Sequence, residues 1–425
     1  MVRQLLGMGG QGAVYEVEID GRRFALKWYH DHYIAIDRGL RQRLTQAVER
    51  GAPDRTFLWP LDIVVRPDSE SFGYIMLLRD PAYAGMRGLI ARPPDRIELT
   101  LALRMMLCAR VANSFLELHS RGFCYQDINF GNLFLDPTTA DILICDNDNV
   151  NIDGAEASIY GTRKFMAPEV VRREVLPSTT TDLFSMAVLF FYALIGWHPL
   201  DGRREASFRV LDGAAELSLY GTAPVFLFDP DDDSNGPVPG LHDPLVMRWS
   251  TLSRALRQLF VRSFSEGLNQ PSRRVLEFEW RNAFVAAHAS IFTCTACGYE
   301  HCADPELASQ DEPSRCARCG EVLIVPPLMT VGRTLFAAQP GRAMPRHCLG
   351  AMTELDFTQT VASAESHPSD PRIVGLRNRG QDEWQARIPG RGTTRVPPDR
   401  AVRLTPGTEI VFGKATGRVL GAPAA

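Results

Sequence analysis

Four glycines near the amino terminus constrain the fold of this chain more than any other feature. Gly7, Gly9, Gly10 and Gly12 lie within the sequence GMGGQG. One strand pattern, VRQLLG, leads into the glycines, and a second, AVYEVEI, follows them directly. A dinucleotide-binding fold would require a helix at that point. A glycine-rich turn between two strands therefore predicts a flap whose backbone N–H groups approach the phosphates of ATP.

The following strand pattern supports this interpretation because it contains a lysine. Ala25 and Lys27 lie in the sequence RFALKWY, after a turn at Asp20-Gly21. Lys27 is expected to place a positive charge near the α- and β-phosphates. A helical pattern at about 37–50 and two more strand patterns, LWPLDIVV and GYIMLL, complete this part of the chain. The sequence thus predicts a small β-rich lobe with one helix.

The segment from 81 to 290 favours helices. Apolar residues recur at helical spacing from 97 to 119, and Gly122 ends the pattern. The most apolar run, MAVLFFYALI, is much shorter than the roughly 20 residues that span a bilayer, so it predicts a buried helix. The segment around 201–248 is expected to be a long irregular insertion, and its acidic stretch DPDDDSNGPVPG is expected to be an exposed loop.

Several polar motifs follow the first long helix in a fixed order. They are YQDINFGN (125–132), CDND (145–148), APE (167–169), Asp182, GWHP (196–199) and PSRR (271–274). In this order, and with the glycine turn and Lys27 ahead of them, residues 1–290 resemble a eukaryotic-like (Hanks-type) protein kinase of the bacterial kind. The resemblance implies a bilobal fold, with a first lobe at 1–80 and a second at 81–290.

The resemblance also implies a role for each polar residue of the expected site. Phosphoryl transfer requires metal ions, a lysine on the phosphates and a carboxylate that orients the attacking hydroxyl. By position, Asp127 would be the catalytic base, while Asn132 and Asp146 would bind Mg²⁺. A turn-forming role is the alternative for Asp127 and Asn132. The implied nucleotide-binding residues are Gly7, Gly9, Gly10, Gly12, Val14, Ala25, Lys27, the gatekeeper Met76, and Leu77 and Leu78 through their backbone.

Three positions depart from the family pattern. Tyr125-Gln126 replaces the usual His-Arg before the catalytic aspartate, so the arginine that would bind a phosphorylated activation loop is absent. Asp146-Asn147-Asp148 replaces Asp-Phe-Gly and loses the apolar residue and the glycine that permit the familiar flip.

The third departure concerns the acidic partner of Lys27. The helix glutamate of the family is expected near Gln46, and the nearest acid is Glu49. A solvated surface glutamate is the alternative interpretation of Glu49. If neither residue serves, another group or a partner protein must hold the lysine.

Other landmarks of the family are expected to have structural or regulatory roles. Glu169 and Arg273 are predicted to form a buried ion pair in the large lobe. Ser158, Tyr160 and Thr162 precede the APE motif and are the candidate regulatory or substrate-docking hydroxyls. Thr162 resembles the family threonine that bonds the catalytic aspartate.

Cysteine spacing predicts a second module at 291–325. Cys294 and Cys297 form one Cys-x-x-Cys pair, and Cys316 and Cys319 form another after 18 residues. This spacing is typical of a structural four-thiolate Zn²⁺ site in a zinc ribbon. His301 and Cys302 are alternative ligands. The loop between the pairs is acidic, which opposes nucleic-acid binding by the ribbon.

The last segment, 326–425, predicts a small β-rich domain. Short strand patterns such as AVRL and EIVFG alternate with Pro- and Gly-rich turns. The ending faintly resembles a forkhead-associated sandwich, without the Ser and His that bind phosphothreonine in such domains. The fold class predicted for the whole chain is α+β: a bilobal kinase-like fold, a zinc ribbon and a sandwich-like domain.

Composition and resemblance together give the functional expectation. A net charge of −4 offers no general attraction for nucleic acid, and the amino terminus shows no secretory signal, so a cytoplasmic protein without membrane association is expected. The motifs YQDIN and CDNDN are similar to those of bacterial stress-associated kinases, including a tellurite-resistance-linked group. That resemblance implies a PP2C-type phosphatase and a von Willebrand-type protein as partners. The predicted function is a serine/threonine protein kinase; a pseudokinase-type nucleotide-binding scaffold is the alternative.

Overall fold

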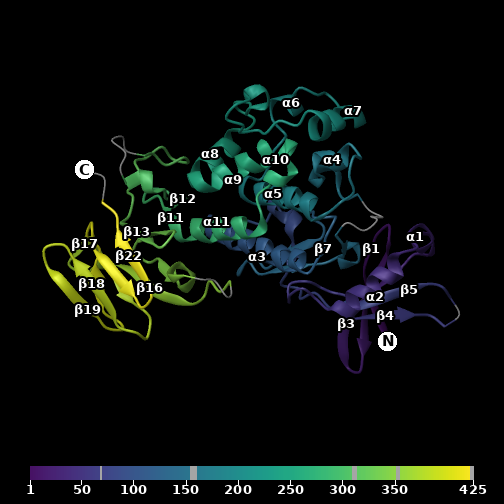
Figure 1. Ribbon diagram of the computed structural model, residues 1–425, viewed down its shortest axis with the longest axis horizontal. Coiled ribbons are helices and arrows are strands. Elements are labelled where there is room, and N and C mark those ends of the chain that lie inside the picture. The colour runs from purple at the N-terminus through teal and green to yellow at the C-terminus, as the bar shows by residue number, and fades with distance from the viewer. Residues whose placement is uncertain (68, 154–159, 309–313, 351–354, 422–425) are drawn as a thin grey trace. The chain divides into compact units, whose positions relative to one another are not determined.

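A computed structural model describes residues 1–67, 69–153, 160–308, 314–350 and 355–421 (Figure 1). The chain divides into two compact units, which are considered separately. The first comprises Met1–Glu98, Arg110–Gly236 and Val261–Phe278, and the second comprises Leu99–Ala109, Pro237–Phe260 and Glu279–Ala425. The boundaries predicted near 80, 290 and 325 stay predictions.

A five-stranded antiparallel sheet forms the amino-terminal part of the first unit. The strands in spatial order are β1 (Val2–Met8), β2 (Gly12–Ile19), β3 (Arg22–Tyr29), β5 (Phe72–Leu77) and β4 (Asp62–Val65). The glycine cluster forms the turn between β1 and β2. The sheet therefore places the glycine turn and Lys27 of β3 on adjacent strands, since Val14 pairs with Lys27.

Two helices follow β3 where the sequence predicted one. They are α1 (Asp31–Ile36) and α2 (Leu40–Arg50). The break lies at Asp37, whose carboxylate accepts a hydrogen bond from Arg43 at 2.9 Å. Leu40 and Leu44 of α2 are buried in a core with the aromatic side chains of the sheet. Leu40 and Leu44 therefore mark the face of α2 that packs against the sheet.

Helices dominate the chain after β5. The α-helices are α3 (Leu101–Ser120), α4 (Pro168–Val171), α5 (Thr179–Ile195), α6 (Arg203–Ala206), α7 (Gly213–Leu217), α8 (Asp243–Thr251), α9 (Arg254–Phe264), α10 (Glu266–Asn269) and α11 (Glu277–Ser290). Short 3-10 helices are η1 (Met86–Ile90), η2 (Asn147–Asn149), η3 (Arg163–Phe165), η5 (Asp233–Asn235), η6 (Pro271–Arg273), η7 (Pro305–Ala308) and η8 (Arg346–Leu349), and η4 (Ser218–Thr222) is a π-helix.

Helix α5 is the buried helix that the apolar run predicted. Its start is defined by Thr181, whose hydroxyl accepts a hydrogen bond from the backbone N–H of Ser178 at 2.9 Å. Its end is defined by Gly196, which adopts the left-handed conformation with φ 80°. Nearly the whole helix is buried, which explains why its sequence is apolar on every face.

Short strands complete the first unit. One small sheet has the order β6 (Ala84–Gly85), β8 (Leu133–Leu135) and β9 (Ile142–Ile144). The other pairs β7 (Phe123–Cys124) with β10 (Asn151–Ile152). These strands flank the two polar motifs at 125–132 and 145–148.

The predicted insertion at 201–248 is more structured than its composition suggested. Residues 230–234, which include Asp231, Asp232 and Asp233, are exposed, as expected. Asn235, however, is buried, and its amide donates to the backbone oxygens of Leu200 at 2.9 Å and Val225 at 2.7 Å. Phe226 and Leu227 are also buried. Within the stretch predicted to be an exposed loop, the prediction was therefore wrong at Asn235, which is buried.

The cysteine-rich segment of the second unit contains an antiparallel pair, β11 (Ile291–Thr293) and β12 (Glu300–Cys302). Two acids, Glu300 within β12 and Asp304 just after it, reach the starts of helices in the same unit. The Glu300 carboxylate accepts from the backbone N–H of Leu101 at the start of α3. The Asp304 carboxylate accepts from Arg254 N–H at the start of α9, at 2.9 and 3.1 Å. Both contacts satisfy N–H groups that helix starts leave unpaired.

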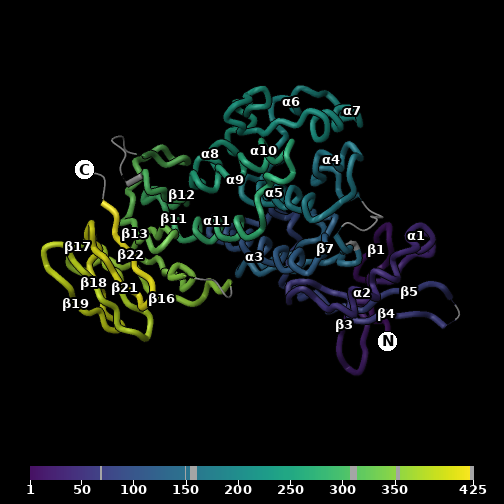
Figure 2. The backbone as a smooth tube through the Cα atoms, viewed as in Figure 1, coloured from purple at the N-terminus to yellow at the C-terminus, as the bar shows by residue number. Residues whose placement is uncertain are grey.

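Two antiparallel sheets form the carboxy-terminal part of the second unit (Figure 2). The first has the order β14 (Thr334–Ala337), β13 (Leu328–Val331), β22 (Ala415–Val419), β21 (Glu409–Phe412), β18 (Trp384–Ile388) and β19 (Gly392–Val396). The second has the order β15 (Ala343–Pro345), β16 (Thr360–His367), β17 (Asp370–Asn378) and β20 (Ala401–Arg403). One core cluster joins residues of both sheets, including Phe336, Leu376 and Ile410.

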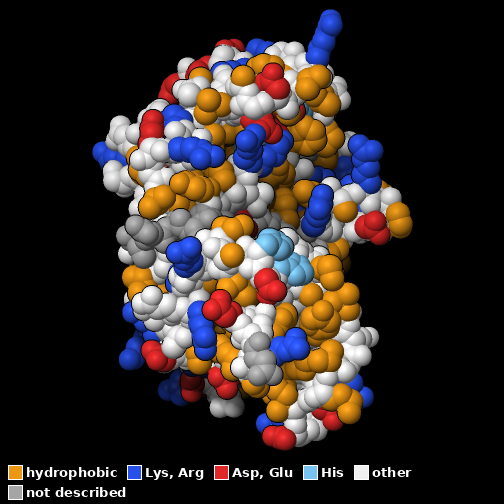
Figure 3. Space-filling view, turned by 90° about the vertical axis from the view of Figure 1, so that its right-hand side faces the viewer, with side chains coloured by type: hydrophobic (Ala, Val, Ile, Leu, Met, Phe, Trp, Pro, Cys, Tyr) orange, Lys and Arg blue, Asp and Glu red, His pale blue; other side chains and the backbone are white. Residues whose placement is uncertain are grey.

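The surface and the helices carry two further observations. Among the described residues, no helix is both long and apolar enough to cross a bilayer. On the face shown in Figure 3, basic and acidic side chains are interspersed with apolar patches. This mixture agrees with the small net charge of the sequence.

Candidate active site

A cavity lies against the sheet of the first unit, beside the glycine turn. Its volume is about 520 Å³, within the range of small-molecule sites. The predicted residues Gly7, Val14, Ala25, Met76 and Leu78 all line it. Leu77, the other predicted residue of this edge, lines it as well. The cavity is mostly apolar, as the base of a nucleotide requires.

The four glycines of the turn fall into two groups. A Cβ atom at Gly7, Gly9 or Gly10 would meet nothing within 4 Å in the described structure. A Cβ atom at Gly12 would lie 2.2 Å from the carbonyl oxygen of Trp28 on β3. Gly12 is therefore required by strand packing, whereas the other three leave open space beside the backbone. That space fits a phosphate chain that must approach backbone N–H groups closely.

Lys27 is the centre of a buried polar cluster. Its ammonium group donates to the Asp148 carboxylate at 2.8 and 3.0 Å and to the Asp146 carboxylate. It also donates to the side-chain oxygen of Gln11 at 2.6 Å. Lys27 is 6% exposed and Asp148 is 3% exposed. The three donors of the lysine thus meet two carboxylates and one amide.

Neither Gln46 nor Glu49 is the partner of Lys27, and another group of the chain holds the lysine. Glu49 is exposed and Gln46 is half-buried, and Lys27 instead pairs with Asp146 and Asp148. The reason is the sequence of the segment after β9, which places a carboxylate where the family has glycine. The sequence shows the loss of that glycine but does not reveal that Asp148 contacts Lys27. The only available signal was an unexplained acid two residues after a predicted metal ligand.

Burial and charge shift the pKa values of this cluster in different directions. Burial and the neighbouring Asp148 charge raise the pKa of Asp146 to about 6. Burial also opposes ionisation of Asp148, but the Lys27 ammonium and hydrogen bonds outweigh it, so the pKa of Asp148 lies below its usual value. Burial alone would lower the pKa of Lys27, yet the two carboxylates raise it. Lys27 and Asp148 are therefore a charged pair at neutral pH.

Two tyrosines hold Asp148 in place. The Tyr29 hydroxyl donates to one carboxylate oxygen at 2.6 Å, and the Tyr74 hydroxyl lies 3.4 Å from the other. Both side chains are buried in the sheet core. Burial next to the Asp148 charge raises the pKa of each phenol. The hydroxyls therefore remain protonated donors.

Gln11 connects the glycine turn to α1 as well as to Lys27. Its amide nitrogen donates to the Tyr33 hydroxyl at 3.1 Å, while its oxygen accepts from Lys27. Tyr33 lies on α1. A single flap side chain therefore bridges the lysine and the first helix.

The loop at 125–132 brings together the polar residues that the motif predicted. The Asn132 amide donates to the Asp127 carbonyl at 2.9 Å, and the Thr162 hydroxyl donates to the Asp127 carboxylate at 2.8 Å. The Thr162 contact is the one that the resemblance implied. Gly161 has φ 94°, and a Cβ atom there would lie 2.7 Å from the Gln126 carbonyl oxygen. Only glycine fits this close approach.

The loop and the segment after β9 are joined through their backbones. Cys145 N–H donates to the Asn132 carbonyl at 2.9 Å. The Tyr125 hydroxyl donates to the Cys145 carbonyl. Tyr125, one of the departures from the family, thus ties the loop of Asp127 to the segment of Asp146. The carboxylate of Asp146 and the amide of Asn132 offer the hard oxygen ligands that Mg²⁺ prefers.

Asn147, the second departure, is fixed rather than free to flip. Its side chain is buried, and its amide donates to the carbonyls of Leu58 at 2.9 Å and Ile144 at 3.0 Å. A polar anchor thus replaces the apolar residue of the family at this position.

Asp182, at the start of α5, holds the backbone of the loop that carries Asp127. Its carboxylate accepts from the backbone N–H groups of Tyr125 at 2.5 Å and Gln126 at 3.0 Å. His119 lies between Asp182, at 3.2 Å, and Glu277. Burial opposes the charged imidazole, but the two carboxylates outweigh it and raise the pKa of His119 to about 9. A buried cation thus links α3, α5 and α11.

Backbone pairing and Asp153 hold the start of the segment that precedes the APE motif. Its β10 strand pairs with β7, and Asp153 accepts from the Thr179 N–H at 2.8 Å. Gln126, which replaces the family arginine, points instead to the Cys124 sulfur at 3.6 Å. Tyr160 is partly exposed, and the Arg173 guanidinium lies over its ring. Ser158, the other candidate hydroxyl, lies outside the described residues.

The buried ion pair of the large lobe uses a different arginine from the one predicted. Arg274 donates to both Glu169 carboxylate oxygens, at 2.7 and 2.8 Å, and both residues are buried. Arg273 is exposed. The two arginines are adjacent, so their opposite burial follows from the turn of η6 and could not be read from the motif.

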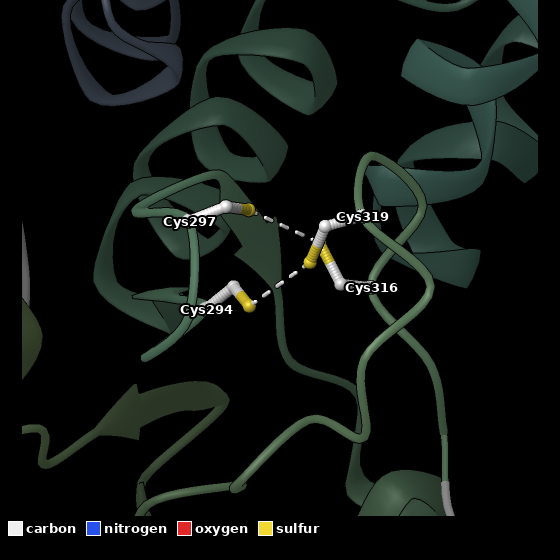
Figure 4. Close-up of side chains that lie close together, drawn as sticks. All are labelled: Cys294, Cys297, Cys316 and Cys319. Atoms are coloured by element: carbon white, nitrogen blue, oxygen red, sulfur yellow. Dashed lines mark hydrogen bonds between the residues drawn. The ribbon is translucent and has the colours of Figure 1, made fainter.

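The four paired cysteines of the second unit converge (Figure 4). Their sulfurs lie within 4.8 Å of one another, with Cys294–Cys319 at 3.8 Å and Cys297–Cys316 at 3.6 Å. Tetrahedral Zn²⁺ with Zn–S bonds of about 2.3 Å would separate the sulfurs by about 3.8 Å. The residues therefore fit a zinc ion.

The two cysteine turns are built alike. Gly298 N–H donates to the Cys294 carbonyl at 2.8 Å, and Gly320 N–H donates to the Cys316 carbonyl at 2.9 Å. Both glycines have positive φ, at 71° and 76°.

His301 and Cys302, the alternative zinc ligands, differ in their distance from the four-cysteine cluster. His301 Nε2 lies 3.4 Å from the Cys316 sulfur, where it neighbours a ligand. Cys302 is buried and faces the Ala287 carbonyl at 4.0 Å. The geometry therefore favours the four paired cysteines over Cys302.

Comparison with known proteins identifies a domain within the chain. Residues 90–234 match the family model described as protein kinase domain. The chain is 33% identical over 87 residues to the serine/threonine-protein kinase SCH9 of Candida albicans, which covers 20% of this chain and 11% of that protein. It is 25% identical over 210 residues to the protein kinase C delta type of Mus musculus, which covers 48% of this chain and 30% of that protein.

A plant relative gives a similar result. The CBL-interacting protein kinase 3 of Oryza sativa subsp. japonica is 33% identical over 89 residues, which covers 20% of each chain. The chain thus spans between 11% and 30% of the length of these curated relatives. It contains a protein kinase domain, with serine/threonine kinases among its relatives.

Proposed function

We propose that this protein transfers the γ-phosphate of ATP to serine or threonine hydroxyls of protein substrates. The observation that carries the proposal is the contact of Lys27 with the Asp146 carboxylate, together with the backbone hydrogen bond that joins Cys145, a residue of the cavity wall, to Asn132. The match of residues 90–234 to the protein kinase domain supports it. The named relatives support serine or threonine as the acceptor.

The chain's own residues divide the work of phosphoryl transfer. Asp127 is positioned by Asn132 and Thr162 and would accept the hydrogen bond of the attacking hydroxyl. Lys27 would neutralise charge on the nucleotide phosphates. Asn132 and Asp146 would hold Mg²⁺, which when bound neutralises charge that develops on the transferred phosphoryl group. The glycine turn would cover the phosphates and exclude water.

Zinc is proposed as a structural ion of the second unit. The four cysteines supply a closed ligand set with no position left for a substrate. The acids Glu300 and Asp304, beside the second strand of this segment, bind helix starts within the unit. Zinc would therefore stabilise those helices together with the ribbon.

The biological setting is proposed from resemblance. The chain would act in the cytoplasm of a bacterium, in a stress-associated pathway. A PP2C-type phosphatase and a von Willebrand-type protein would be its partners there.

A nucleotide-binding scaffold is the second candidate, and one observation favours it. The catalytic loop from Tyr125 to Leu135 contains no lysine or arginine. As a scaffold, the chain would bind ATP and act through its zinc and β-rich parts without transferring phosphate.

Incubation of the full chain with Mg²⁺ and radiolabelled ATP tests the proposal. Asp127→Asn should reduce phosphate incorporation by about 10⁴-fold or to background, because the hydroxyl loses the group that orients it. ATP affinity, measured by calorimetry, should change little. Wild-type protein that binds ATP but transfers no phosphate to itself, casein or histone would establish the scaffold instead.

A further inference from the structure

We propose that Asp148 is the positioning residue for Lys27, in the role that a helix glutamate is expected to have in a kinase of this kind. The inference rests on the proposed function, because it names the group that aligns the phosphate-binding lysine. Asp148 contacts Lys27 through both carboxylate oxygens, at 2.8 and 3.0 Å. No prediction from the sequence assigned Asp148 a role.

The acids of the two helices after β3 are all accounted for elsewhere. Asp31 accepts from Ser71 at 2.6 Å, and Asp37 binds Arg43. Glu49 is exposed. These are the three acids between 31 and 50. Neither helix therefore supplies the carboxylate of the pair.

The two carboxylates on Lys27 have different surroundings, which separates their roles. The Asp146 side chain is 27% exposed, and it is the proposed magnesium ligand. The Asp148 side chain is 1% exposed and is held by Tyr29 and Tyr74. Because Asp146 is committed to the metal in the proposed function, Asp148 is the partner that Lys27 retains when nucleotide is bound.

This arrangement has a consequence for control of the site. The carboxylate of a helix glutamate reaches the lysine only when the helix is correctly placed. Asp148 lies on η2, two residues from Asp146, and its tyrosine partners lie on the central strands β3 and β5. The lysine and its carboxylate thus lie within the same compact unit and are joined without a residue of α1 or α2. Alignment of Lys27 does not depend on movement of α2.

The reactivity of Lys27 in the nucleotide-free full chain tests the inference without relying on activity. The protein is treated with an amine-reactive ester, and modification of Lys27 is followed by peptide mass spectrometry. In Asp148→Asn, modification should be about tenfold faster, the size expected when a hydrogen bond to a charged group is lost. Tyr29→Phe, a milder change, should give a smaller increase. Glu49→Gln is the matched control and should behave as wild type.

Phosphate transfer is measured on the same proteins. Asp148→Asn should lower the rate at saturating ATP about 10²-fold, the cost of misplacing a group near the reaction by about 1 Å. Wild-type reactivity of Lys27 in Asp148→Asn would overturn the inference. So would a raised Mg²⁺ requirement without a change in Lys27 reactivity, which would make Asp148 a metal ligand.

The two proposals fail differently. Released Lys27 in Asp148→Asn, together with no phosphate transfer by wild type, would remove the kinase function and leave the pairing intact. Phosphate transfer by the wild type, together with unchanged Lys27 reactivity in Asp148→Asn, would leave the kinase function intact and remove the proposed pairing. Thermal unfolding of each variant separates both outcomes from simple loss of fold.

Discussion

The four-cysteine cluster and the Lys27 cluster are both groups of converging polar side chains, but their members are brought together in different ways. The cysteines come from one segment, 294–319, and from two turns of identical design. Lys27 and Asp148 are separated by 121 positions in the sequence. The first cluster is encoded in local spacing, and the second exists only because a β-strand and a distant loop meet.

The clusters also differ in what stabilises them. Unpaired thiolates gain little from one another without a metal ion, so the ligand set depends on zinc for its stability. The Lys27 cluster contains its own opposite charges and the hydroxyl donors of two tyrosines. It should therefore persist without any added ion. Three experiments compare side chains brought together by local spacing with buried pairs formed between distant segments.

Removal of one zinc ligand should have the largest effect. Cys316→Ser should abolish zinc binding, which is measured as metal per chain by mass spectrometry. Structural zinc contributes about 10–16 kcal/mol to folding of such modules, so the ribbon should lose structure. Hydrogen exchange should then rise in the ribbon and at the first turns of α3 and α9, which Glu300 and Asp304 cap.

Cys302→Ala is the control for this experiment, because Cys302 is buried in the same segment but lies outside the cluster. It should keep one zinc ion per chain. Zinc retained by Cys316→Ser would show that the ligand set differs from the four paired cysteines.

Loss of a long-range ion pair should have an intermediate effect. Arg274→Met leaves the buried Glu169 carboxylate without its partner and should lower the free energy of unfolding by about 3–5 kcal/mol. Arg273→Met, at the adjacent exposed position, should change it by less than about 0.5 kcal/mol. Chemical denaturation of both variants measures the difference. Equal effects would mean that the pairing of Glu169 with Arg274 is wrong.

The smallest expected effect is a pH dependence that arises from His119. Its pKa in the folded protein is raised from 6.5 to about 9. The resulting stabilisation is therefore fully present below pH 6.5 and is lost as the pH rises through about 9. The shift corresponds to about 3 kcal/mol. Denaturation midpoints between pH 6 and pH 10 should fall in wild type and fall less in His119→Gln. Parallel curves for the two proteins would exclude His119 as the source.

Much of the candidate site followed from the sequence because its residues lie in short motifs. The glycine turn, Lys27 of β3 and the loop of Asp127 are each defined by neighbours within a few positions. Where the structure differs from what the sequence led us to expect, the difference concerns which distant residues contact one another. Arg274 rather than Arg273 binds Glu169, and neither Gln46 nor Glu49 binds Lys27. Ser158 lies outside the described residues, so its role stays a prediction.

The insertion and Asp148 illustrate the same limit. The stretch at 230–234 is exposed, as its composition predicted. Asn235, which follows it, is buried against the backbone oxygens of Val225 and Leu200, which lie 10 and 35 positions away in the sequence. Asp148 in isolation is an ordinary loop acid. Its function as a lysine partner depends on Tyr29 and Tyr74, which no motif connects to it.

The sequence by itself determined the strand–turn–strand flap, the order of the polar motifs and the zinc spacing, because backbone geometry and metal coordination act over a few residues. Only the tertiary structure decided which carboxylate faces Lys27 and which arginine is buried beside Glu169. A buried charge is stable only with a partner in direct contact. That partner is chosen by how distant segments pack, and a linear pattern does not record it.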